Sequence, residues 1–434
     1  MPTRIAEAAP QAPADKNAAP TAEKPTTTPI SVTAAQSFPA PAPAPVNPTI
    51  TALAGAIADG SNIAPTLSAS AGLTQTAQPV AVASHLLKIE LHPAELGVVT
   101  ANLRLSGFFR TVEAFVVVRA RHPLVLLAAL VAVAGFFSAL LVNDTICLVM
   151  TPIVLDLVRR LGRNPVPYLL AVAMASNAGS VATITGNPQN MIIGSFAGIA
   201  YGDFALALAP VALAALVITI VLVALLHPAE FLTRERLPVP KPRPSRPNRP
   251  LVAKSLAVLV AMVGFFLAGH PPAGVAILGG ALLLVTRRVK AEKVYFDIDW
   301  PLLVMFAGLF VVVAGFDTAV VGPEVHALVA RLRLDEVASL TGVTLVLSNL
   351  VSNVPAVLVL QPFVAPLADP QKAWLVIAMA ATLAGNLTLV ASVANLIVAQ
   401  KARAGGVTVS FWAHFRVGAP MTLLSLMFGM WWLS

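Results

Sequence analysis

The stretch VNDTICLVMTP at residues 142–152 has a counterpart in SNVPAVLVLQP at residues 352–362. In both, an asparagine interrupts an apolar run, at Asn143 and Asn353, and a proline follows nine residues later. Each half then continues with a second apolar segment that small and polar residues break, around 176–190 and 383–395. Paired interruptions at corresponding points of two halves are typical of secondary transporters and indicate where such proteins bind their substrates.

The composition is that of a membrane protein. Of 434 residues, 57% are hydrophobic and 11% are charged, whereas soluble domains carry about 25% charged residues. Apolar runs near 203–227, 251–269 and 409–433 approach or exceed the roughly 20 residues that a helical span needs. We therefore predict an all-α polytopic, multi-pass membrane protein. Together with the family resemblance given below, this composition makes a bacterial inner membrane the expected location.

The net charge of +8 does not indicate nucleic acid binding. The basic residues lie in short loops between the apolar segments, where the positive-inside rule places them on the cytoplasmic side. Lipid is therefore the expected environment, and no nucleic acid partner is predicted. The single cysteine, Cys147, lies in an apolar run, so no internal disulfide is possible and its thiol is interpreted as a small packed hydrophobe.

The chain before residue 108 differs from the remainder. Residues 1–84 are rich in alanine, proline and threonine, and we expect them to be disordered because such a segment buries too little apolar surface. Residues 85–107 contain two strand-like runs, 85–91 and 98–105, on either side of a turn at Pro93. This pattern predicts a short β-hairpin.

The membrane part divides into two repeats joined by a basic, proline-rich linker that marks the cytoplasmic side. Each repeat contains a helical hairpin, then a broken helix. The predicted boundaries are 108–227 for the first repeat (hairpin 123–160, broken helix 165–198), 228–250 for the linker, and 251–434 for the second repeat (hairpin 337–367, broken helix 373–399).

The hairpins are predicted to be re-entrant and inverted. Arginines stand at both ends of the first hairpin, and its arm after Asp144 is about 15 residues long, shorter than a full span. An odd number of apolar segments separates the two hairpins, because 165–198, 203–226, 251–269, 273–285 and 300–321 make five. The second hairpin must then enter the membrane from the opposite side, which is the arrangement of an inverted repeat.

The interruptions of the apolar segments are the expected binding sites. An interrupted helix is costly in hydrocarbon unless it lines a polar cavity. Helix N-termini at a break attract an anion, and freed carbonyls with side-chain oxygens suit a hard cation such as Na⁺. The candidate binding residues are Asn143, Asp144, Thr145, Asn177, Thr185, Gly186, Asn187, Pro188, Asn190, Ser352, Asn353, Ser392 and Asn395.

Plainer roles remain open for several of these residues. Asn143 and Asn353 can be ordinary N-caps of the second hairpin arms, and Asp144 can cap the same helix end. An intramembrane carboxylate is nevertheless a functional hypothesis, which makes Asp144 a candidate proton or cation carrier. Gly186 and Pro188 can simply kink a packed helix.

Enzyme chemistry is not indicated. The sequence shows no nucleophile–base arrangement, dinucleotide fingerprint or P-loop, so neither a catalytic residue nor an ATP-driven step is predicted. No cofactor is expected beyond Na⁺ or H⁺ as a coupling ion.

Two resemblances refine this prediction. The string LKIELHPAELGVVTANLRLSG at 87–107 resembles the C-terminal domain of flagellar hook-length control proteins. Residues 108–434 resemble the ion transporter superfamily, nearest to its citrate-transporter-like and arsenite-efflux-like permeases. The strings that carry this second resemblance are FFSALLVNDTICLVMTPIVLDL, ASNAGSVATITGNPQNMIIG, LVLSNLVSNVPAVLVLQPFV and AGNLTLVASVANLIVAQ.

The superfamily resemblance implies a permease for a small anion or oxyanion, such as citrate, a dicarboxylate or arsenite. It implies tip ligands at Asn143 and Asn353, unwound segments at Gly186, Pro188, Asn190, Ser392 and Asn395, elevator-like movement and a possible homodimer. The tips depart from the Ser-Asn-Thr of dicarboxylate symporters, and the family's membrane helices before the first hairpin are missing. The alternatives are therefore a sodium/proton antiporter that uses Asp144, and an inactive fusion of a truncated permease with a flagellar fragment.

Overall fold

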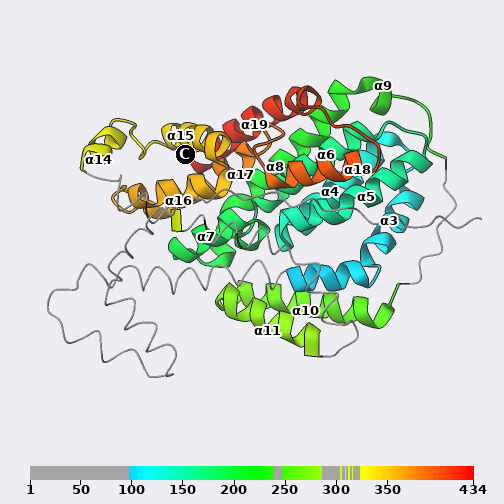
Figure 1. Ribbon diagram of the computed structural model, residues 1–434, viewed down its shortest axis with the longest axis horizontal. Helices are drawn as coiled ribbons and strands as arrows, with labels where there is room; N and C mark the ends of the chain where they lie inside the picture. The colour runs from blue at the N-terminus through cyan, green and yellow to red at the C-terminus, as the bar shows by residue number, and fades with distance from the viewer. Residues whose placement is uncertain are drawn as a thin grey trace, which may run out of the picture. The chain divides into compact units, whose positions relative to one another are not determined.

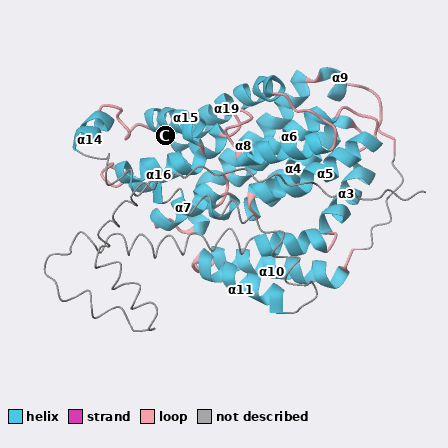
Figure 2. Cartoon of the chain, in the orientation of Figure 1, coloured by secondary structure: helices cyan, strands magenta, loops and turns pink. Residues whose placement is uncertain are grey.

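The computed structural model describes residues 97–238, 247–285 and 323–434, with a few isolated positions between 304 and 315. Every regular element in these ranges is a helix (Figures 1 and 2). The first half contains α3 (Phe108–Arg119), α4 (Pro123–Leu140), α5 (Asn143–Arg160), α6 (Pro165–Ser180), the 3₁₀ helix η1 (Ile184–Gly186), α7 (Pro188–Phe196), α8 (Tyr201–Leu226) and α9 (Pro228–Phe231). The second contains α10 (Arg249–Leu267), α11 (Pro272–Val285), α14 (Pro323–Ala330), α15 (Val337–Val351), α16 (Asn353–Val364), α17 (Pro370–Ala384), α18 (Val393–Ala404) and α19 (Phe411–Leu433).

The β-hairpin predicted for residues 85–107 is wrong in its second half. Residues 97–105 are helical, and Asn102 Nδ2 donates to the Val98 carbonyl one turn earlier at 2.8 Å. Val99 and Leu103, also one turn apart, are fully buried. Tertiary burial therefore overrides the β-propensity of the valines. The first predicted strand, 85–91, and the segment 1–84 lie outside the described residues.

The same order of elements occurs twice: two helices joined at a tip, a broken helix, and a long helix. In the first half these are α4 and α5, then α6 with α7, then α8. In the second half they are α15 and α16, then α17 with α18, then α19. Both tips and both breaks fall inside the ranges that the sequence predicts.

Local signals explain where the helices start. Proline occupies the first turn of α4, α6, α7 and α17, where its missing N–H costs nothing. The preceding side chains of His122, Asn164, Asn187 and Asp369 accept a backbone N–H of the first turn. A capping side chain followed by proline fixes each start in the sequence itself.

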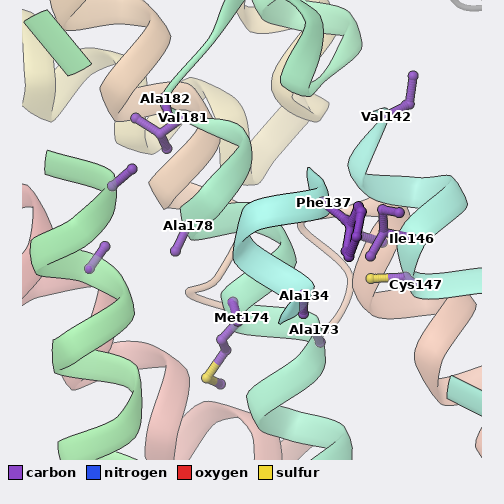
Figure 3. Close-up of a cluster of buried hydrophobic side chains, with 14 of the residues drawn as sticks. Ala134, Phe137, Val142, Ile146, Cys147, Ala173, Met174, Ala178, Val181 and Ala182 are labelled. Carbon is purple, nitrogen blue, oxygen red and sulfur yellow. The ribbon is translucent and has the colours of Figure 1, made fainter. Parts of the chain in front are cut away.

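The first hairpin packs on the broken helix beside it. A Cβ atom on Gly179 of α6 would lie closer than 3.0 Å to the Gly135 backbone of α4, so glycine allows these two helices to touch. Figure 3 shows Phe137 of α4 beside Ile146 and Cys147 of α5. Cys147 is fully buried there, as its interpretation as a small packed hydrophobe requires.

Three of the described helices, α4, α8 and α10, are long and apolar enough to cross a membrane. On α8, Leu206 is 75% exposed and Leu213 63% exposed. Large apolar side chains on the outside of a helix suit contact with lipid. The chain is therefore a multi-pass membrane protein.

Ion pairs gather where the linker leaves α8. Arg163 Nε pairs with Glu230 Oε1 of α9 at 2.8 Å, and the Tyr168 hydroxyl donates to the same carboxylate at 3.0 Å. The hydrogen bond with Glu230 raises the pKa of Arg163 above its usual value. Asp156 of α5 pairs with Arg160 one turn later at 3.2 Å. Residues 239–246 of the linker are not among those described.

Candidate functional site

Four helix N-termini meet around one cavity. The helices α5, α7, α16 and α18 start at the two hairpin tips and the two breaks. Their first residues surround a cavity of about 210 Å³. Its lining consists of Asn143, Asp144, Pro188, Gln189, Val351, Ser352, Asn353, Val354, Pro355, Ser392 and Val393. The fold therefore brings both tips and both breaks, which lie far apart in sequence, to a single site.

An asparagine secures each break. Asn190 Nδ2 donates to the carbonyls of Ser180 at 3.1 Å and Thr183 at 3.0 Å. Asn395 Nδ2 donates to the carbonyls of Gly385 at 2.7 Å and Thr388 at 3.2 Å. Both side chains thus satisfy backbone carbonyls that the interrupted helix leaves free. Neither residue lines the cavity, so the two predicted ligands act on the backbone of the broken segments.

The two halves contact each other reciprocally. Asn187, the N-cap of α7, donates from Nδ2 to Thr382 Oγ1 of α17 at 3.2 Å. Ser392, which stands before α18, donates from Oγ to Asn177 Oδ1 of α6 at 3.2 Å. The break in each half is therefore hydrogen-bonded to the helix that precedes the break in the other half, α17 or α6. The same kind of contact thus occurs in both directions between the two halves.

Asn177 connects the first tip with the second break. Its Oδ1 accepts from Asn143 Nδ2 at 3.0 Å, and its Nδ2 donates to Oδ1 of Asn386 at 2.9 Å and of Asn395 at 3.2 Å. All four asparagines are buried. Because a buried amide that loses its partner costs free energy, this network couples the position of the tip to that of the break.

The side-chain oxygen of each tip asparagine, Asn143 and Asn353, makes no hydrogen bond to the described residues. Asn143 is 4% exposed and Asn353 is 8% exposed. Both residues line the cavity. Buried amide oxygens without partners, on residues that line a cavity, can take a cation or a water molecule as a ligand.

Asp144 also lines the cavity and is 8% exposed. It lies in the first turn of α5, where the positive end of the helix dipole favours a carboxylate. Among the described residues that line the cavity, none carries a positive charge. The described residues also contain no group of three His, Cys, Asp or Glu side chains that would hold a metal.

Three further predicted residues lie away from the cavity lining, besides Asn177, Asn187, Asn190 and Asn395. Thr145 is partly exposed and is not a lining residue. Thr185 Oγ1 pairs with the Tyr201 hydroxyl at 2.8 Å. Gly186 packs against the Ser180 carbonyl, which a Cβ atom would approach closer than 3.0 Å. Thr185 and Gly186 shape the first break, and no observation places Thr145 in the site.

Other residues of the site were not among the candidates. Gln189 lines the cavity and donates to Thr382 Oγ1 at 3.1 Å, and Asn386 donates to the Met174 carbonyl. His414 of α19 is fully buried, with Nε2 3.0 Å from the Asn386 carbonyl. Gln189 and Asn386 stand within the polar breaks, which is a usable signal. A lone Thr382 or His414 in an apolar segment gives none.

Ser352 at the second tip has a strained backbone, with φ 78° and ψ 163°. Only glycine adopts this region readily, and other residues pay about 1–3 kcal/mol. We expect Ser352→Gly to raise the melting temperature of the purified protein, whereas Ser352→Ala keeps the strain and does not. Equal melting temperatures for the two variants would contradict this assignment.

Comparisons with known proteins show which family this chain is similar to. The citrate transporter family matches residues 44–383, a range that begins ahead of position 108 and includes the flagellar-like string. An uncharacterized transporter of Mycobacterium tuberculosis is 34% identical over 76% of this chain and 81% of its own length. The silicon efflux transporter LSI3 of rice, Oryza sativa, is 29% identical over 75% of this chain and 82% of its own.

The fold has a counterpart among solved structures. The crystal structure of the Alcanivorax borkumensis YdaH transporter, which has an unusual topology, superposes with a TM-score of 0.57. The match covers 80% of this chain and 83% of that one at 14% identity. Since the family profile spans most of the sequence and a relative above 30% identity is covered over most of its length, this chain belongs to the citrate transporter family.

Proposed function

We propose that the protein is an ion-coupled secondary transporter that moves a small anion or oxyanion, such as citrate, a dicarboxylate or arsenite. The convergence of four helix N-termini on one cavity carries this proposal. The starts of α5, α16 and α18 have no side-chain cap. Their first-turn N–H groups are therefore left for an anion, which the positive ends of the helix dipoles also attract.

A coupling cation completes the charge balance. The described lining offers one carboxylate, Asp144, and no cationic side chain. An anion beside Asp144 would be repelled unless a positive charge entered with it. The unpartnered Oδ1 atoms of Asn143 and Asn353, together with the Asp144 carboxylate, are oxygen ligands that suit Na⁺.

Alternating access follows from the repeat. The reciprocal contacts Asn187–Thr382 and Ser392–Asn177 favour a two-fold relation between the halves, and the odd number of segments between the hairpins favours an inverted one. Relative movement of inverted halves would open the cavity to each membrane side in turn. The transport cycle then needs no covalent step and no cofactor.

A sodium/proton antiporter that uses Asp144 is the second candidate function. The observation that favours it is the burial of this carboxylate in the lining of the same cavity as Asn143 and Asn353, whose amide oxygens have no partner among the described residues. A carboxylate in such a site can bind either a proton or Na⁺, so the two ions would compete for it.

Reconstituted proteoliposomes separate these functions. We expect citrate, arsenite or a related anion to accumulate when a Na⁺ or proton gradient is imposed. In Asp144→Asn, we expect the anion to require a higher cation concentration by about tenfold, because the lost carboxylate contributes about 1.4 kcal/mol to cation binding. Na⁺-driven proton movement with no anion uptake would establish the antiporter instead. No ion movement of either kind would favour an inactive fusion.

A further inference from the structure

Helix α15, the first arm of the second hairpin, is polar inside and apolar outside. Its buried residues are Leu340, Thr341, Thr344 and Ser348, and the three hydroxyl residues are at most 2% exposed. On its outer side Val346 is 57% exposed and Leu350 is 74% exposed. A helix with lipid outside and a hydroxyl stripe inside indicates a polar path within the protein.

The hydroxyls of this stripe have no partners. The Oγ1 atoms of Thr341 and Thr344 and the Oγ of Ser348 are buried without a hydrogen bond in the described part of the chain. Elsewhere, buried hydroxyls in helices donate to the carbonyl one turn back, as Thr151 does at 2.6 Å and Thr219 at 2.8 Å. Each unpaired buried hydroxyl costs about 1–3 kcal/mol, so three together call for a ligand such as water.

The corresponding helix of the first hairpin, α4, lacks this hydroxyl stripe. The offset of 210 residues between Asn143 and Asn353 places Val131, Ala134 and Ser138 of α4 at the corresponding positions. The first two are apolar, and Ser138 Oγ is paired with Ser176 Oγ at 2.5 Å. The corresponding face of α4 therefore carries no unpaired hydroxyl at these three positions. Of the two hairpins, only the second has the hydroxyl stripe.

The stripe leads from the helix start to the cavity. Ser348 precedes Ser352, which lines the cavity, by one turn. Thr341 and Ser352 are about 16 Å apart along the helix at the usual rise per residue. Beyond Thr341, at the start of α15, the exposed carboxylates of Asp335 and Glu336 stand at the far end. Glu336 pairs there with Arg333 at 2.6 Å, and Asp335 accepts the Ala368 amide at 2.9 Å, so this end of the stripe is polar and exposed to solvent.

We propose that the hydroxyls of Thr341, Thr344 and Ser348 hold a file of water molecules through which the coupling cation passes between the cavity and one membrane face. This assignment rests on the proposed cation-coupled transport. Water between hydroxyls about one helical turn apart replaces the missing hydrogen bonds and keeps the cation hydrated. The two apolar positions in α4 leave no such file in the first hairpin.

Cysteine accessibility tests the path without knowledge of the substrate. Thr341→Cys, Thr344→Cys and Ser348→Cys are each treated with a membrane-impermeant maleimide, in intact cells and in everted vesicles. Since thiols react as thiolates in contact with water, we expect labelling from at least one side, about tenfold faster than in Val346→Cys or Ala134→Cys. The native Cys147 is fully buried, so the parent chain gives the baseline.

The proposed path would be wrong if the three stripe cysteines were labelled no faster than Val346→Cys and Ala134→Cys from either side of the membrane. A second measurement links it to transport: Thr344→Val should slow cation-driven uptake about tenfold, while Thr344→Ser retains it. Equal rates in these two variants would also count against the path. If the stripe is labelled but no tip variant changes any ion movement, the path stands and the proposed function fails.

Discussion

Asn143→Ala and Asn353→Ala are each expected to reduce transport by roughly 10- to 100-fold, because a hydrogen bond or ligand contact to a charged group contributes about 1.5–3 kcal/mol. Each change removes an unpartnered amide oxygen from the cavity. Asn143→Ala also removes the donor to Asn177 Oδ1 and so loosens the network between the first tip and the second break. Initial uptake rates in proteoliposomes, normalised to the amount of inserted protein, measure the effect.

Asn164→Ala is the matched control for these variants. Asn164 is an exposed N-cap whose side chain accepts from the Val166 amide at 3.1 Å. Its loss should lower the free energy of unfolding by about 1 kcal/mol and leave transport unchanged. Val142 and Ser352, not the tip asparagines, occupy the N-cap positions of α5 and α16. If the tip asparagines contributed only to helix stability, their alanine variants would behave like Asn164→Ala. Full transport by both tip variants would therefore remove them from the binding site.

Gly186→Ala is expected to have the second large effect. The added Cβ atom would lie closer than 3.0 Å to the carbonyl oxygen, Cα and carbonyl carbon of Ser180. Because these are backbone atoms, no rotamer relieves the clash, and overpacking of this kind costs about 1–3 kcal/mol. The first break would have to open, which moves Pro188 and Gln189 away from the cavity. We expect a lower melting temperature together with the loss of transport.

Gly264→Ala controls for the change of residue type. Gly264 lies in α10, and a Cβ atom there meets nothing within 4 Å. Alanine at this position should leave the melting temperature unchanged or raise it, since alanine stabilises a helix by roughly 0.5–1 kcal/mol over glycine. Wild-type stability and transport in Gly186→Ala would show that the close approach to Ser180 is dispensable.

The sequence was sufficient to predict the all-helical class, the two tips and the two breaks. These features are local: a polar residue or proline inside an apolar run interrupts a helix wherever the run lies. The tips at Asn143 and Asn353 and the breaks after Ser180 and Ala384 follow from this rule. The same kind of reasoning failed for residues 98–105, because valine favours a strand only until tertiary packing buries it in a helix.

Only the tertiary structure decided what each polar residue does. Asn190 and Asn395 donate to backbone carbonyls, Asn177 joins the two halves, and the Oδ1 atoms of Asn143 and Asn353 have no partner among the described residues. An asparagine amide both donates and accepts, so its sequence position shows that a break is polar and does not show which partner it takes. The partners lie up to about two hundred residues away, as Asn187 and Thr382 do. Packing of the two halves brings them within hydrogen-bond distance, and this distance assigns each role.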